Sequence, residues 1–190
     1  MGANRSGETP AVIGALREDA RQLAVAMGRQ AEGRHPVRAA LTQDSYSILA
    51  LWRLRCLVRR WRIPLANHLL RLLQSVFFGI ELGNGITLGR GVFFVHPIGI
   101  VVGGDASVGD RVRFMGSNTV GTARDDGCPV IEEDVTLGAG ARVLGRIRVG
   151  ARTVIGANAV VLADLPADSV AVGIPARVVS RAERSLLTAG

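Results

Sequence analysis

Residues 131–160 read IEEDVT, LGAGAR, VLGRIR, VGARTV and IGANAV, five consecutive units of six residues. Most units open on a bulky aliphatic residue, glycine often follows it, and the fifth residue is usually small or apolar. The same repeat runs through residues 82–119 as LGNGIT, LGRGVF, FVHPIG, VGGDAS, VGDRVR and FMGSNT. The fifth positions hold Ile86, Val92, Ile98, Ala106, Val112, Val135, Ala141, Ile147 and Ala159.

A period of six fits neither an α-helix nor a free-standing alternating strand. It fits a coil of three short strands in which every sixth side chain points into a narrow axis, with about eighteen residues in each coil. Stacked coils then supply hydrogen bonds to one another, and no unit is stable alone. A glycine-rich β-sandwich is the alternative, but its turns recur every 8–12 residues.

Two interruptions break the repeat. Ile100 and Val101 are extra residues between two units, and residues 123–130, ARDDGCPV, separate the two runs. A loop ejected from a regular solenoid usually lies on the working face, because the coils themselves offer flat walls. We therefore expect residues 123–130 to lie near the functional site.

Composition supports a core of stacked aliphatic strands. Hydrophobic residues make up 48% of the 190 residues but aromatic residues only 4%, and 24 glycines are available for corners. The net charge of +7 is confined to one end, since residues 1–75 hold 12 Arg and 5 acids whereas residues 76–190 hold 11 of each.

Residues 1–75 predict a short helical region, of which the first 40 or so residues are expected to be flexible. Helical spacing appears over residues 15–27 and again from Asp44, a candidate N-cap. In the second helix we place Leu54, Leu57, Val58, Trp61 and Leu65 on the apolar face and Arg55, Arg59 and Arg62 on another. Pro64 should end or kink it, and a further helix should span residues 65–76. The predicted divisions are residues 1–75, 76–180 and a tail, 181–190.

Cys56 and Cys128 show neither metal-ligand spacing nor a disulfide framework, so we expect a reducing cytoplasm and no metal. Residues 1–10 lack the apolar core of a signal peptide. The apolar stretch 63–80 is interrupted by Pro64, Asn67, His68 and Arg71, so we expect no membrane-spanning helix.

Three stretches resemble the hexapeptide-repeat acyltransferases and, within them, the serine acetyltransferases. Residues 95–112, VHPIGIVVGGDASVGDRV, are similar to the active-site coil of that family. Residues 127–161 are similar to its later coils, and residues 170–179, VAVGIPARVV, to the segment that closes its β-helix. The resemblance implies a mainly β fold, a left-handed parallel β-helix, in a homotrimer with acetyl-CoA between subunits.

His96 is the one histidine of the repeat region, and a surface role is its simplest reading. Acetyl transfer needs a base that can accept a proton near neutral pH, and imidazole suits that role. The resemblance makes His96 the catalytic base. It also implies an orienting carboxylate fifteen residues earlier, at Glu81, where the family usually has Asp. A solvated charge at the start of the coils is the alternative for Glu81.

The resemblance implies further contacts with acetyl-CoA. Small residues at coil edges let the pantetheine arm lie against backbone, and a basic residue near the closing segment meets the nucleotide phosphate. The corner around residues 120–123 would supply an oxyanion donor. Any single glycine can equally be a corner that a narrow coil requires. The expected cofactor-binding residues are Thr122, Gly138, Ala139, Gly156, Ala157 and Arg177.

The acceptor site departs from the family at Val95 and Cys128, where Asp and a second histidine are usual. Losing both should weaken recognition of a zwitterion such as serine. The sequence shows no base beside Cys128 that would activate its thiol as a nucleophile, so we expect no covalent catalysis. The leading hypothesis is O-acetylation of serine or a related small acceptor. The alternatives are a sugar or amine acceptor and a non-catalytic scaffold.

The basic stretch Arg53–Arg62 has three interpretations. We favour packing against trimer mates through its apolar residues, with solvated arginines. Contact with an anionic membrane is possible but not favoured, and no recognition motif indicates nucleic acid. Many serine acetyltransferases end in Ile and dock a sulfhydrylase. This sequence ends LLTAG, so we do not expect that partner.

Overall fold

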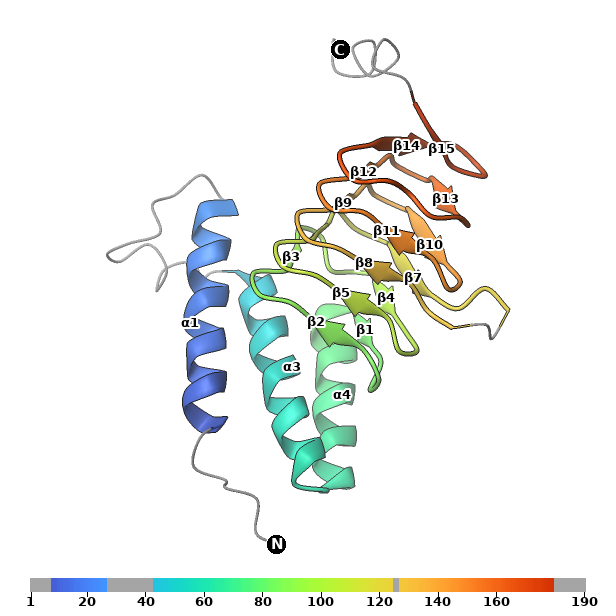
Figure 1. Ribbon diagram of the computed structural model, residues 1–190. Coiled ribbons are helices and arrows are strands. Elements are labelled where there is room, and N and C mark those ends of the chain that lie inside the picture. Colours follow the sequence, from blue (N-terminus) through green and yellow to red (C-terminus); the bar gives the residue numbers. More distant parts are fainter. Residues whose placement is uncertain (1–7, 27–42, 125–126, 180–190) are drawn as a thin grey trace, which may run out of the picture.

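The computed structural model describes residues 8–26, 43–124 and 127–179, in which a layer of helices precedes a stack of short strands (Figure 1). The helices are α1 (Glu8–Ala26), α3 (Asp44–Arg60) and α4 (Pro64–Phe78). The predicted tail, 181–190, lies outside the described residues, as do residues 1–7 and 27–40 of the predicted flexible region. The strands are β1 (Glu81–Leu82), β2 (Thr87–Leu88), β3 (Phe93–Phe94), β4 (Val101–Val102), β5 (Ser107–Val108), β6 (Arg113–Phe114), β7 (Thr119–Gly121), β8 (Val130–Ile131), β9 (Thr136–Leu137), β10 (Arg142–Leu144), β11 (Arg148–Val149), β12 (Val154–Ile155), β13 (Val160–Val161), β14 (Val170–Val172) and β15 (Arg177–Val178).

Three parallel sheets form the walls of the stack. Sheet A has the order β1-β4-β7-β10-β13, sheet B the order β11-β8-β5-β2, and sheet C the order β15-β14-β12-β9-β6-β3. Val102 pairs with Val120, and Val143 with Val161, so a regular coil advances eighteen residues. The closing segment is the exception to parallel pairing, because β15 runs antiparallel to β14. The parallel β-helix predicted from the six-residue repeat is therefore confirmed.

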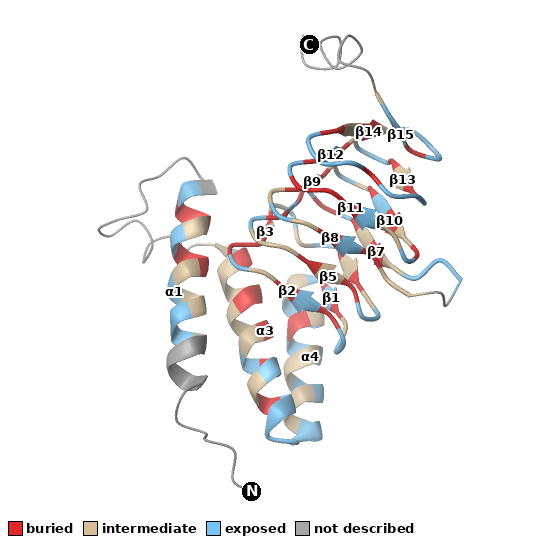
Figure 2. Ribbon diagram, viewed as in Figure 1, coloured by how far each residue is buried: buried red, intermediate tan, exposed pale blue. Residues whose placement is uncertain are grey.

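The core is a narrow column of side chains inside the coils, and Figure 2 shows buried residues recurring along the stacked coils. The first residue of every quoted unit is buried, and Phe94 stacks on Phe114 with ring centroids 5.2 Å apart. The fifth-position prediction is wrong at Ile98, whose side chain is 75% exposed, while Ile100 is fully buried. The structure places the two additional residues within the turn 95–100 and not at Ile100 and Val101, because Ile100 takes the inward position expected for Ile98 and Val101 pairs with Thr119 in β4.

Helix boundaries follow local signals. Pro64 opens α4 at a first-turn position, where a missing N–H costs nothing. Gly79 ends α4 in the left-handed conformation, with φ of 61°. Asp44 lies in the first turn of α3 and not at its N-cap, which is Gln43.

The predicted faces of α3 are partly wrong, although Val58 is buried and Arg59 is exposed as predicted. Arg55 is fully buried, whereas Leu54 and Trp61 are exposed, and Leu65 is exposed at the start of α4. The face of α3 that packs inward carries Ile48, Leu49, Trp52 and Val58 together with Arg55. The guanidinium of Arg55 finds acceptors on α4 and on the first coil, which permits its burial.

The helical layer covers the open edge of the first coil. Ser45 Oγ donates to the Phe94 carbonyl (2.8 Å) and accepts from the Phe94 N–H (3.1 Å). Arg53 donates to the carbonyls of Leu88 (2.9 Å) and Gly89 (2.6 Å), and Arg55 to that of Leu82 (3.0 Å). Each edge strand, β1, β2 and β3, thus has polar side chains of α3 in place of a preceding coil.

Within the described ranges, none of the helices is both long and apolar enough to cross a lipid bilayer.

Candidate active site

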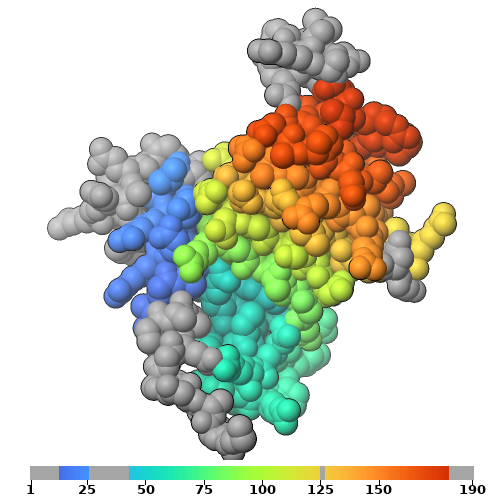
Figure 3. Space-filling model, in the orientation of Figure 1, coloured from blue at the N-terminus to red at the C-terminus, as the bar shows by residue number. Residues whose placement is uncertain are grey.

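Most of the predicted site residues lie in the turns that join the three sheets, whereas Glu81 lies in β1 and Arg177 in β15. We call the turns from sheet C to sheet A the C–A corner; they are residues 95–100, 115–118, 138–141 and 156–159. The turns from sheet A to sheet B form the A–B corner, residues 83–86, 103–106, 122–129 and 145–147. The turns from sheet B to sheet C form the B–C corner, residues 89–92, 109–112, 132–135 and 150–153. Residues 122–124, at the start of the longest A–B turn, stand out from the coils (Figure 3).

His96 lies in the C–A turn that contains the two additional residues. Its side chain is exposed, and its Cβ lies over Gly116 of the next coil. A Cβ built on Gly116 would come within 3.1 Å of the His96 Cβ, so glycine leaves room for the histidine. The longer turn therefore presents an imidazole to solvent at a coil edge, where a reacting group could reach it.

Asn118 supports this corner and was not anticipated. It takes the fifth position of the unit FMGSNT, where the repeat expects a small or apolar residue, and it is fully buried. Its Oδ1 accepts from the Gly116 N–H (3.0 Å), and its Nδ2 donates to the Gly138 carbonyl (2.7 Å). The sequence does carry a signal for this role. An asparagine at an inward position of the repeat is expected to be buried, and a buried amide must form hydrogen bonds.

Glu81 begins β1, next to Val101, which follows the His96 turn. Its side chain is largely exposed, and its carboxylate forms an ion pair with Arg71 of α4 at 3.6 Å. Among the described residues, no hydrogen bond joins Glu81 to His96. Arg71 is a second residue that the sequence analysis missed, because only the fold brings α4 beside β1.

The expected cofactor contacts divide between the corners. Gly138, Ala139, Gly156 and Ala157 lie in the C–A corner, in coils beyond that of His96, while Thr122 lies in the A–B corner. A Cβ on Gly138 would lie 2.5 Å from the backbone nitrogen of Ala157, so close packing of coils accounts for this glycine. Arg177 is exposed on β15, and its Nη1 donates to the Ala176 carbonyl (2.9 Å).

The two expected acceptor residues lie at different corners. Val95 shares the His96 turn, whereas Cys128 lies in the A–B corner beside Gly104 and Asp105. Partial burial, and then the neighbouring Asp105 carboxylate, raise the pKa of the Cys128 thiol. The thiol is therefore protonated at neutral pH, which disfavours a nucleophilic role. A single chain does not bring Cys128 and Thr122 together with the His96 corner.

Within residues 8–26, 43–124 and 127–179, no three His, Cys, Asp or Glu side chains lie close enough together to hold a metal ion.

Comparison with known proteins gives consistent matches. The family model for bacterial transferase hexapeptide (six repeats) matches residues 128–163. A serine acetyltransferase of Synechococcus elongatus is 36% identical over 156 residues, covering 80% of this chain and 64% of the relative. One from Bacillus subtilis is 44% identical over 117 residues, covering 58% and 54%. One from Helicobacter pylori is 39% identical over 136 residues, covering 70% and 80%.

Solved structures agree in shape. A serine acetyltransferase in complex with cysteine superposes with a TM-score of 0.78 at 30% identity, covering 90% of this chain and 71% of the other. A serine acetyltransferase in complex with CoA gives 0.75 at 28%, covering 90% and 70%. The soybean enzyme complexed with serine gives 0.77 at 29%, covering 90% and 70%. The likeness confirms the left-handed parallel β-helix with a short N-terminal helical region.

The chain spans less than two thirds of the length of the Synechococcus and Bacillus relatives, at 64% and 54%. It nevertheless covers 80% of the Helicobacter relative at 39% identity, across the coils and into the helical region. The repeat, the fold and these matches together show that this chain belongs to the serine acetyltransferase family of hexapeptide-repeat transferases.

Proposed function

We propose that the protein is an acetyl-CoA-dependent O-acetyltransferase that acetylates serine or a related small hydroxylated acceptor, with His96 as general base. The observation that carries the proposal is the lengthened C–A turn, which holds an exposed imidazole over Gly116 in the same corner as the small residues of later coils. Relatives named serine acetyltransferase, and a relative's structure with CoA, support the same chemistry.

In the proposed step, the imidazole of His96 accepts the proton of the acceptor hydroxyl as its oxygen bonds to the thioester carbonyl carbon. The carbon–sulfur bond then breaks, and the imidazolium returns the proton to the departing CoA thiolate. The products are an acetyl ester and CoA with a free thiol. Backbone N–H groups around residues 120–123 would stabilise the oxyanion, and Glu81 would orient the imidazole once released from Arg71.

Acetyl-CoA is the proposed co-substrate. Its pantetheine arm would lie along the C–A corner, where Ala139 and Ala157 are exposed and carry only methyl groups. Gly156 and Thr122 would contact the arm, and the exposed guanidinium of Arg177 would meet a phosphate.

A homotrimer is proposed because the candidate residues occupy two edges of one chain. His96, Val95 and the small residues line the C–A corner, while Thr122 and Cys128 lie in the A–B corner. A site that uses both edges needs a second copy of the chain, and three copies around an axis along the coils supply three such sites.

A cytoplasmic location accords with two free cysteines, Cys56 and Cys128.

Contact of the stretch Arg53–Arg62 with a membrane is less well supported than packing of this stretch against other parts of the protein. Arg53 is held by Asp19 at 3.4 Å and by two coil carbonyls, and Arg55 is buried. Two of the five arginines of this stretch therefore hold the fold together and do not face a lipid surface.

Release of the CoA thiol tests the catalytic role of His96. We expect His96→Ala to lower turnover by about 10²–10⁴-fold, the usual contribution of a general base. The fold should survive, because the side chain is exposed. His68→Ala is the matched control, since His68 is exposed on α4 and lies outside the site. Unchanged turnover in His96→Ala would remove the mechanism.

A second assay tests the acceptor. We expect a low kcat/KM for serine, because Val95 offers no carboxylate to an ammonium and Cys128 no imidazole. The double substitution Val95→Asp and Cys128→His should raise kcat/KM for serine. Faster turnover of a sugar or an amine than of serine would favour the alternative acceptors. Absence of acetyl-CoA binding in calorimetry would favour a non-catalytic scaffold.

A further inference from the structure

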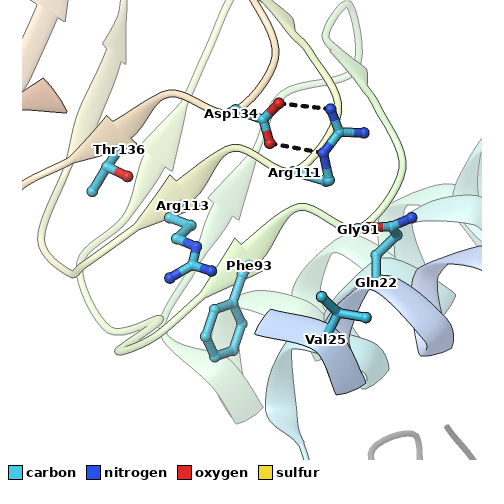
Figure 4. A pocket seen from close by; sticks show the side chains of 8 residues that line it. All are labelled: Gln22, Val25, Gly91, Phe93, Arg111, Arg113, Asp134 and Thr136. Atoms are coloured by element: carbon cyan, nitrogen blue, oxygen red, sulfur yellow. Dashed lines mark hydrogen bonds and ion pairs between the residues drawn. The ribbon is translucent and has the colours of Figure 1, made fainter. Parts of the chain in front are cut away.

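A cavity of about 340 Å³ opens between α1 and the outer face of sheet C (Figure 4). Phe93, Arg113 and Thr136 form one wall, because they occupy the same register position on three consecutive strands. Gln22 and Val25 of α1 form the facing wall. The volume falls within the range of pockets that hold small organic ligands. Among the described residues, none of the C–A or A–B corner lines this cavity.

Charge on the cavity wall is unbalanced. Arg111 and Asp134 form an ion pair. The Nε and Nη2 atoms of Arg111 donate to the two carboxylate oxygens of Asp134, at 2.7 and 2.6 Å. This pairing raises the pKa of Arg111 and lowers that of Asp134, so both stay charged and cancel. Within the part of the chain that the structure describes, the Arg113 side chain forms no hydrogen bond or ion pair, whereas its backbone N–H donates to the Val135 carbonyl (2.8 Å). Its guanidinium is the excess positive charge at the cavity.

The same cavity offers apolar surface beside that charge. The ring of Phe93 lies below the Arg113 guanidinium in Figure 4, and Val25 of α1, which is 53% exposed, lines the facing side of the cavity. The Gln22 amide is occupied, since its Nε2 donates to Glu18 Oε1 at 2.6 Å. One guanidinium next to an aromatic face and a branched aliphatic side chain suits a ligand with one negative charge and an apolar body.

We propose that this cavity binds a small organic monoanion whose carboxylate pairs with Arg113 and whose apolar or aromatic body lies against Phe93 and Val25. A single uncompensated guanidinium favours a monoanion over a phosphate-rich ligand. Because α1 contributes one wall and sheet C the other, an occupied cavity would hold α1 against the coils.

Benzoate is a suitable probe, and its binding is followed by ligand-observed NMR titration of the full chain without acetyl-CoA or serine. We expect saturable binding of benzoate and at least about ten-fold weaker binding of benzamide, its neutral isostere, and of acetate, which lacks the ring. Arg113→Gln should weaken benzoate binding at least about ten-fold. Arg17→Gln is the matched control, since Arg17 is an exposed arginine of α1 outside the cavity.

A second variant guards against an indirect effect of Arg113→Gln. Val25→Glu places a carboxylate opposite the guanidinium, so benzoate binding should be lost while circular dichroism and thermal unfolding stay unchanged. Equal benzoate affinity in Arg113→Gln and the unsubstituted protein would overturn the proposal, and so would equal affinity for benzamide and benzoate. Neither result bears on His96, because no acetyl transfer is measured.

Discussion

Gly138 and Gly103 follow inward aliphatic residues at equivalent places in their repeats, yet their surroundings differ. A Cβ on Gly138 would meet the backbone of the next coil at 2.5 Å, whereas a Cβ on Gly103 would meet nothing within 4 Å. The repeat marks both residues as corners, and only the spacing of the coils separates a required glycine from a tolerated one.

This difference gives a paired prediction. Gly138→Ala should lower the free energy of unfolding by about 1–3 kcal/mol, because backbone atoms of the next coil must move. Gly103→Ala should be neutral or slightly stabilising. Urea unfolding of the two variants checks this. Equal stability of both variants would mean that the coils relax freely at residue 138.

At the scale of elements, α3 works as a cap on the first coil through polar side chains. Arg55 Nη1 donates to Gln74 Oε1 at 2.7 Å and to the Leu82 carbonyl at 3.0 Å, and Nη2 donates to Asn84 Oδ1 at 2.9 Å. The guanidinium also lies 5.3 Å from the Trp52 ring centroid. Burial lowers the pKa of Arg55, but a guanidinium stays charged at neutral pH.

Removing this cap should be costly. We expect Arg55→Met to lose about 1–3 kcal/mol of unfolding free energy, because buried acceptors on α4 and β1 lose their donor. Adding Gln74→Leu should recover part of the loss, since one unsatisfied group disappears. Denaturant unfolding of the single and double variants measures both effects. An Arg55→Met protein as stable as the unsubstituted one would contradict the capping role.

The B–C corner gives a pH-dependent prediction. The Arg111 hydrogen bond lowers the pKa of Asp134 in the folded protein, so the pair stabilises the fold at neutral pH and loses that effect as pH falls through the lowered value. Asp134→Asn should therefore flatten the fall in stability between about pH 5 and pH 3, by at most about 1 kcal/mol for an exposed pair. Asn tolerates the φ of 59° at this position. Equal pH slopes, measured by urea unfolding, would argue against the pairing.

For the whole molecule, the two groups of candidate site residues lie at separate edges of one chain. His96 is in the C–A corner and Cys128 is in the A–B turn of 122–129. If neighbouring copies supply the two edges, each site takes its histidine from one chain and its loop from another.

Mixed trimers test this arrangement. His96→Ala and a variant lacking residues 122–127 should each be inactive alone. Trimers refolded from an equal mixture should recover roughly a quarter of the activity, because that share of interfaces combines an intact histidine with an intact loop. Release of the CoA thiol is the measurement. A mixture as inactive as its components would place the whole site within one chain.

The sequence by itself determined the coils, because an inward aliphatic residue at every sixth position can be buried only in a narrow three-sided stack. It also placed His96 off the inward positions, just before the interruption at residues 100–101, and placed a helix break at Pro64, all of which are local properties of the chain. The faces of α3, the exposure of Ile98 and the burial of Arg55 and Asn118 were decided by the tertiary structure. Whether a side chain is buried depends on acceptors and surfaces that distant segments bring to it, and no periodicity within one segment records those partners.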